Sequence, residues 1–138
     1  MACLAFGGDF TFGARAWKLA EAHSRHAPTY HYRYDYAPRS LQWTGFGATH
    51  ASELLAVFDV YDTRLGALLT VAGDRRSARR VSRNVQRRWR SFSRAGVPGD
   101  DWPRYTIAER ATIIFDRRSR VESDPLAARR QAWAALSG

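Results

Sequence analysis

The sequence predicts an α/β protein, because segments with the apolar spacing of helices alternate along the chain with two segments typical of β-strands. Residues 29–36 place a tyrosine at every second position, and residues 111–115 form a short apolar run. Two strands so far apart in the sequence do not make a stable sheet, since stable sheets usually have three or more strands. We therefore expect that strands are missing on the N-terminal side and that Met1 is a late or misassigned start.

The first half of the chain is predicted to hold two helices around the first strand. Residues 13–26 have helical spacing of their apolar side chains, and Pro28 closes that helix. The strand at 29–36 follows, and residues 41–50 then form a loop whose two glycines permit backbone conformations that other residues resist. A short apolar helix is predicted over 53–60.

The second half begins with a strongly amphipathic helix at residues 75–94. Apolar side chains recur there at every third or fourth position, while arginines occupy the other faces. Gly96 and Pro98 end this helix. After a turn at 102–105 and the strand at 111–115, the pair Asp124-Pro125 predicts the start of a last helix that runs through Trp133.

Composition excludes several classes of protein. The 138 residues correspond to one domain or part of one, and 45% hydrophobic with 13% aromatic residues exclude a disordered polyelectrolyte. No window is apolar enough to span a membrane, and the first six residues are too short and uncharged for a signal peptide. The single cysteine, Cys3, excludes an internal disulfide and a zinc site built on paired cysteines. We therefore expect a cytoplasmic protein.

A net charge of +9 makes a small basic nucleic-acid-binding module the principal alternative function. Lys18 is the only lysine beside 21 arginines, a bias that a GC-rich genome produces without selection for function. The arginines at 75–94 are interpreted as a solvated helix face, and the tyrosines at 29–36 as core residues of a sheet. Nucleic acid is therefore not an expected partner.

Metal and cofactor sites are not predicted. His23, His26, His31 and Asp35 offer metal-ligand chemistry, but their spacing crosses from a helix to a strand and places them on different faces.

Several short motifs follow one another along the chain in a particular order. In the first half they are Gly8-Asp9 with Phe12 and Ala14-Arg15, the segment 27–35, the segment Gly-Ala-Thr-His-Ala-Ser-Glu-Leu at 47–54, and Val57-Phe58. In the second half they are Trp89 and Phe92 with Gly96 and Pro98, then Trp102-Pro103 with Tyr105, then Phe115 and Asp124-Pro125. In this order and spacing they resemble the type B carboxylesterases of the α/β-hydrolase superfamily, which include para-nitrobenzyl esterases and cholinesterases. The resemblance implies that residues 1–138 are the C-terminal part of an α/β-hydrolase fold, incomplete as a domain.

The resemblance assigns the histidine of a Ser-His-Glu/Asp triad to His50. A glycine-containing loop suits this role, because it lets an imidazole reach a serine carried elsewhere on the sheet. Glu53, three residues further on, would supply a supporting carboxylate, or act only as an acid favoured at a helix start. Ala51 departs from the family pattern, which has glycine at that position.

The rest of the triad chemistry is missing from this sequence. No Gly-x-Ser-x-Gly pentapeptide occurs, and the family's oxyanion-hole loop and triad acid lie upstream of Met1. We therefore expect the chain alone to be inactive, although the full-length parent would hydrolyse small-molecule carboxylic esters. Faces that missing strands would cover are expected to be exposed and to cause self-association.

Overall fold

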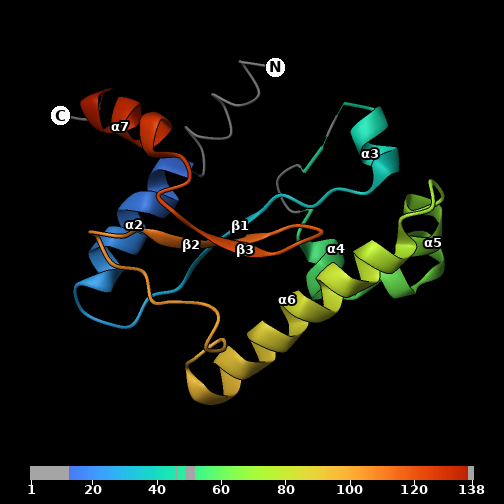
Figure 1. Ribbon diagram of the computed structural model, residues 1–138, viewed down its shortest axis with the longest axis horizontal. Coiled ribbons are helices and arrows are strands. Elements are labelled where there is room, and N and C mark those ends of the chain that lie inside the picture. Colours follow the sequence, from blue (N-terminus) through green and yellow to red (C-terminus); the bar gives the residue numbers. More distant parts are fainter. Residues whose placement is uncertain (1–12, 46, 49–51, 137–138) are drawn as a thin grey trace. The chain divides into compact units, whose positions relative to one another are not determined.

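The computed structural model describes residues 13–45, 47–48 and 52–136 (Figure 1). The helices are α2 (Ala14–Ser24), α3 (Arg39–Trp43), α4 (Leu54–Val57), α5 (Arg64–Leu69), α6 (Arg75–Ala95) and α7 (Ala127–Leu136). A 3-10 turn, η2 (Val60–Asp62), follows α4, and the strands are β1 (His31–Tyr34), β2 (Ala111–Phe115) and β3 (Arg120–Ser123).

The three strands form one sheet in the order β1-β2-β3. The side chain of His31 contacts Thr112, and further along both strands the N–H of Asp35 donates to the carbonyl of Phe115, so β1 and β2 run parallel. A parallel pair needs a long crossover connection, which accounts for the distance between these strands in the sequence. Both predicted strands are confirmed, although the first is shorter than 29–36.

Strand β3 was not predicted from the sequence. It is exposed along most of its length, and Val121 is its only large apolar side chain, so it lacks the alternation that marks a half-buried strand. Strand β2 is buried at every position, as the apolar run predicted. The expectation of two strands was therefore wrong, and the α/β class with a partial sheet is confirmed.

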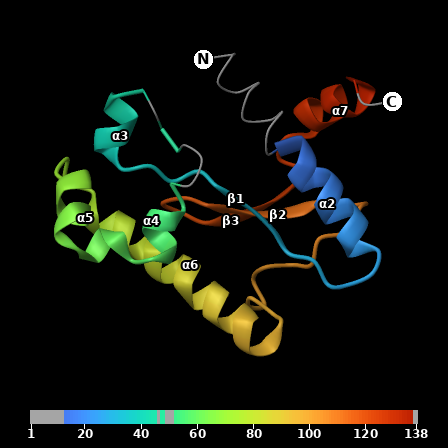
Figure 2. The same ribbon diagram turned by 180° about the vertical axis from the view of Figure 1, so that it is seen from behind.

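Contacts between residues divide the chain into two units. Unit 1 comprises Met1–His31, Pro103–Thr112 and Glu122–Gly138, and unit 2 comprises Tyr32–Trp102 and Ile113–Val121. Helices α2 and α7 belong to unit 1, and α3 to α6 belong to unit 2. Figure 2 shows α6 beside α4, the main helix pair of unit 2.

Arg110 organises unit 1. Its guanidinium contacts the carboxylate of Glu21 on α2, and it donates to the Tyr105 hydroxyl at 2.9 Å. Asp124 lies 3.9 Å from the same guanidinium and is also held by Arg130 of α7. One arginine thus joins α2, the segment before β2 and the start of α7.

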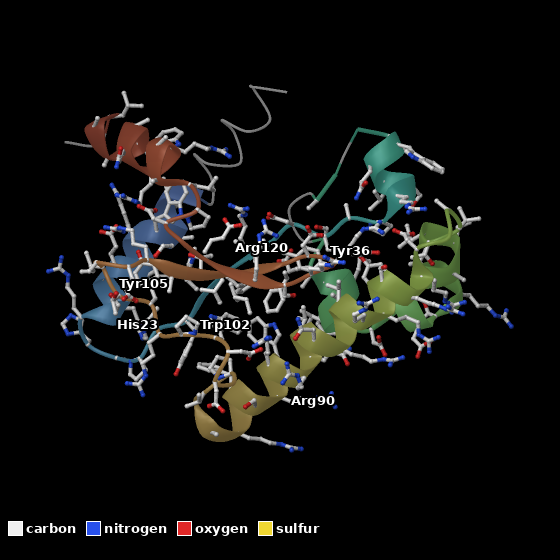
Figure 3. The ribbon with its side chains drawn as sticks, in the orientation of Figure 1. His23, Tyr36, Arg90, Trp102, Tyr105 and Arg120 are labelled. Carbon is white, nitrogen blue, oxygen red and sulfur yellow. The ribbon has the colours of Figure 1, made fainter. Side chains whose placement is uncertain are left out.

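The core of unit 2 is aromatic. The ring of Tyr32 lies 6.0 Å from that of Trp89, 6.1 Å from that of Trp102 and 5.8 Å from that of Phe115, with steep tilts between the ring planes. Tyr36, two residues after the end of β1 and labelled in Figure 3, is buried. The interpretation of these tyrosines as core residues is confirmed for Tyr36.

Helix α6 confirms both the amphipathic helix predicted over 75–94 and its predicted end at Gly96. Val81 and Val85 are buried, and Gly96 caps the helix with φ 69°, a conformation that glycine adopts without strain. Helix α2 confirms the predicted helix at 13–26 with shorter bounds. Among the described residues, no helix is both long and apolar enough to cross a membrane.

Three predicted boundaries were wrong. The helix expected over 53–60 splits into α4 and η2, because Asp59 has φ 54° and interrupts the helical backbone. The last helix begins at Ala127 and not at Asp124, whose φ is 43°. The loop expected over 41–50 also overlaps α3, which ends at Trp43.

Candidate functional site

His50 and Ala51 lie outside the described residues. The loop before them is described at Gly45 and Gly47, whose φ angles are 80° and 60°. Both glycines therefore adopt the left-handed conformation that other residues resist, as the sequence predicted for this loop.

Glu53 occupies the position immediately before α4. Its carbonyl accepts hydrogen bonds from the N–H groups of Ala56 and Val57, both at 2.9 Å, so its backbone already belongs to the first turn. Its side chain is half-buried and does not cap the helix. The geometry therefore gives no support to capping as the role of this carboxylate.

The Glu53 carboxylate lies close enough to β1 to affect its tyrosines. Burial is the main cause that raises the pKa of Tyr32, and the negative charge of Glu53 raises that pKa further. Burial is also the main cause that raises the pKa of Tyr34. The neighbouring Tyr61 hydroxyl raises this pKa further, and the charges of Tyr36 and Glu53 raise it by smaller amounts. This edge of unit 2 therefore holds neutral phenol groups beside one carboxylate.

Helix α6 holds α4 through polar side chains. The Ser82 hydroxyl lies 2.7 Å from the carbonyl oxygen of Ala56 and 2.9 Å from a carboxylate oxygen of Asp59. The side-chain amide of Gln86 donates to the carbonyls of Ala56 and Val57 at 3.3 and 3.2 Å. These contacts satisfy carbonyls that a short helix leaves free at its C-terminus. Residues 52–59 are therefore anchored on a long, stiff helix.

Gly66 allows α5 to approach η2 closely. A Cβ atom at this position would overlap backbone atoms of Val60 and Tyr61. The helix is capped by Thr63, whose hydroxyl oxygen accepts from the Gly66 N–H at 3.3 Å. A threonine followed by an apolar run was the signal by which α5 could have been predicted.

Asp74 is a buried anchor that sequence reasoning missed. One of its carboxylate oxygens accepts from the Tyr36 hydroxyl at 3.2 Å, from the Arg39 N–H at 2.9 Å and from the Arg117 guanidinium at 3.1 Å. The carboxylate thereby joins the end of β1, the start of α3 and the β2–β3 connection. An aspartate directly before a helix predicts a helix cap. The contacts of Asp74 with distant segments cannot be predicted from the residues next to it in the sequence.

Two of the histidines considered as metal ligands, His23 and His31, pair with threonines. Nδ1 of His23 lies 2.7 Å from the Thr29 hydroxyl, and Nδ1 of His31 lies 3.0 Å from the Thr112 hydroxyl. Burial lowers the pKa of His31 and favours its neutral form. Within the described ranges, no three histidine, cysteine, aspartate or glutamate side chains gather as a metal site would require.

Comparison with protein families and known proteins gives one consistent result. The carboxylesterase family model matches residues 1–133. Para-nitrobenzyl esterase of Bacillus subtilis (strain 168) is 31% identical over 126 residues, which are 89% of this chain and 25% of that protein.

Solved structures of esterases are similar as well. A structure of PNB esterase has a TM-score of 0.78 at 31% identity and matches 90% of this chain and 25% of that one. A carboxylesterase of Geobacillus stearothermophilus has a TM-score of 0.76 at 28% identity, over 94% of this chain and 27% of that one. The 138 residues thus span about a quarter of the length of these relatives.

Proposed function

Because the chain belongs to the carboxylesterase family, we propose that residues 1–138 form the C-terminal part of a carboxylic ester hydrolase and supply the histidine of its serine esterase site. The match over residues 1–133 is the observation that carries this proposal. The substrates would be small-molecule carboxylic esters, which agrees with the name of the para-nitrobenzyl esterase that the chain resembles.

His50 is the proposed general base. Its imidazole takes the proton of a serine hydroxyl while the serine oxygen attacks the ester carbonyl, and it then returns this proton to the leaving alcohol. An imidazole pKa near neutrality suits both steps. The left-handed glycine at position 47 supports this assignment, since a glycine-containing loop lets an imidazole reach a serine carried elsewhere on the sheet.

Glu53 is proposed as a positioning residue. It lies three residues after His50 and does not cap α4, so its carboxylate is available to orient the imidazole and stabilise its protonated form. The polar contacts between α4 and α6 support this role, because they hold the backbone of residues 52–59 in place.

The nucleophile is proposed to come from polypeptide outside these 138 residues. The sequence contains no Gly-x-Ser-x-Gly motif, so His50 has no activated serine of the nucleophile-elbow type to work on. Serine attack and oxyanion stabilisation supply most of the rate acceleration in such sites. The 138-residue chain alone is therefore proposed to lack serine-dependent esterase activity.

Complementation with a related esterase tests the proposal. The purified chain is mixed with the N-terminal three-quarters of the Bacillus subtilis para-nitrobenzyl esterase, and hydrolysis of a short-chain nitrophenyl ester is measured. We expect no hydrolysis and no organophosphonate labelling with the chain alone, and serine-dependent hydrolysis with the mixture.

Two histidine variants separate the role of His50 from general effects. His50→Ala should abolish activity of the mixture, whereas His26→Ala, a change at an exposed residue beyond α2, should leave it unchanged. Activity that survives His50→Ala would show that the assignment is wrong. Labelling of the chain alone by the organophosphonate would show that it carries its own nucleophile.

A further inference from the structure

Unit 2 contains a basic cleft of about 540 Å³ that the esterase chemistry does not use. Three segments form it: α6, the loop after α6 at Asp101, and the β2–β3 connection at residues 116–119. Six guanidinium groups line the cleft, those of Arg80, Arg83, Arg87, Arg88, Arg117 and Arg118. Two carboxylates also line it, those of Asp101 and Asp116, and Asp116 lies 4.0 Å from the guanidinium of Arg120 outside the cleft.

Only part of this positive charge is compensated. Arg88 forms an ion pair with Asp101, and Arg117 forms one with Asp74. Arg80, Arg83 and Arg118 have no carboxylate partner among residues 13–45, 47–48 and 52–136. Arg87 makes a hydrogen bond of 3.3 Å to the side-chain oxygen of Asn84, which is neutral. Three or four guanidinium groups therefore have free donors that face the cleft.

The two sides of the cleft are held in place relative to each other. Arg80, Arg83 and Arg87 follow one another at helical spacing on α6, and Arg118 projects from the β2–β3 connection. The side-chain amide of Asn84 donates to the Ser119 hydroxyl at 2.8 Å and so ties this connection to the helix. An anion would meet donors from both sides without first ordering the backbone.

We propose that this cleft binds a compact, multiply charged phosphate group such as a diphosphate. Guanidinium groups match phosphate oxygens in pairs of parallel hydrogen bonds, and their charge persists at any physiological pH. Three or four uncompensated cations fit a ligand with several negative charges better than a single carboxylate. The neutral esters proposed for the family site do not need such a surface, so this site is independent of ester hydrolysis.

A polymeric phosphate is the competing occupant. A second hollow of about 360 Å³ lies along α6, and Arg87, Arg90 and Arg94 line it. Figure 3 labels Arg90 on this helix. The lining residues of this hollow all come from α6, whereas the larger cleft is lined by α6, the loop at Asp101 and the β2–β3 connection. The two-sided geometry favours a compact ligand over a strand that would lie along the helix.

Binding of inorganic pyrophosphate to the 138-residue chain tests the proposal by calorimetry. Titrations at about 0.01 M and 0.15 M ionic strength separate local binding from long-range attraction. The test variant is Arg80→Gln/Arg83→Gln/Arg118→Gln. Its control is Arg64→Gln/Arg76→Gln/Arg104→Gln, which removes the same charge from exposed positions outside both hollows.

We expect pyrophosphate binding at both salt concentrations, weakened more than about tenfold in the test variant and less than about twofold in the control. Circular dichroism should show unchanged helix content in both variants. Equal weakening in the two variants, or no pyrophosphate binding at all, would overturn the proposal.

Two further ligands decide the chemistry of the site. Citrate should bind at least about tenfold more weakly than pyrophosphate, and equal affinity would mean a general anion surface. Single-stranded DNA should bind weakly and lose its affinity at the higher salt concentration. Tight DNA binding that persists at this salt and depends on Arg90 and Arg94 would replace the proposal with a nucleic-acid interface.

Discussion

The side chain of Arg88 is only 4% exposed, and its guanidinium forms two parallel hydrogen bonds with Asp101, at 2.5 and 2.6 Å, although the Asp101 side chain is 61% exposed. A buried cation in the middle of α6 is thus neutralised by a carboxylate that water reaches. The hydrogen bonds from Arg88 are the main cause that lowers the pKa of Asp101 below 3.8.

The Asp101 carboxylate is expected to stabilise the fold at neutral pH and to lose this effect in acid. Its pKa is lower in the folded state than in the unfolded chain, so its contribution is complete above about pH 4 and disappears as pH falls through the folded-state pKa. Asp101→Asn should cost about 1–3 kcal/mol at pH 7 and much less at pH 2. Asp100→Asn, a change at the exposed neighbour, is the control. Urea unfolding at both pH values measures the difference, and an equal loss at both would contradict the role of the charge.

Gly66→Ala is expected to destabilise unit 2. The added methyl group overlaps backbone atoms of Val60 and Tyr61, which cannot move aside as a flexible side chain could. The cost should be about 1–3 kcal/mol or more. Leu68→Ala on the same helix, at a residue 68% exposed, should change stability by less than about 0.5 kcal/mol. Thermal unfolding of the two variants checks this, and a Gly66→Ala chain as stable as the parent would show that α5 does not approach η2 so closely.

Glu53→Gln should impair the complemented esterase through its histidine. If the Glu53 carboxylate stabilises the protonated imidazole, its removal lowers the pKa that limits activity on the acid side. The acid limb of the kcat/KM profile should then move to lower pH, with a fall in kcat of about tenfold or more. Glu109→Gln, at an exposed residue before β2, should leave both unchanged. A fall in activity without a shift of the profile would mean that Glu53 acts on the fold and not on His50.

The chain is expected to self-associate through apolar residues of α5. Leu65 and Leu68 lie three residues apart on one face of that helix, and both are exposed, as is Val71 just beyond it. Sedimentation should show association that rises with concentration, together with strong binding of an apolar dye. Leu65→Gln/Leu68→Gln should reduce both, whereas Arg64→Gln should not. A monomer with a sharp cooperative melt would instead favour an independent fold.

Local sequence patterns predicted those elements whose signal lies within the element itself. The bounds of α6 differ by one residue from the amphipathic segment at 75–94, and β2 coincides with the apolar run at 111–115. By contrast, β3 has one large apolar residue, and its place in the sheet depends on β2 beside it. Asp59 interrupts a predicted helix and Asp124 delays the start of another, at backbone angles that no composition signal marks.

The sequence by itself determined the family, because the family's motifs can be recognised by their order and spacing along the chain. It also identified His50 and Glu53 as candidate site residues. Tertiary structure alone decided that Asp74 would join three segments and that Arg88 would be the buried member of an arginine-rich helix. The reason is physical. Helical periodicity arises from neighbours three or four residues apart, but the burial of a charge depends on a partner such as Asp101 that only folding brings within hydrogen-bond distance.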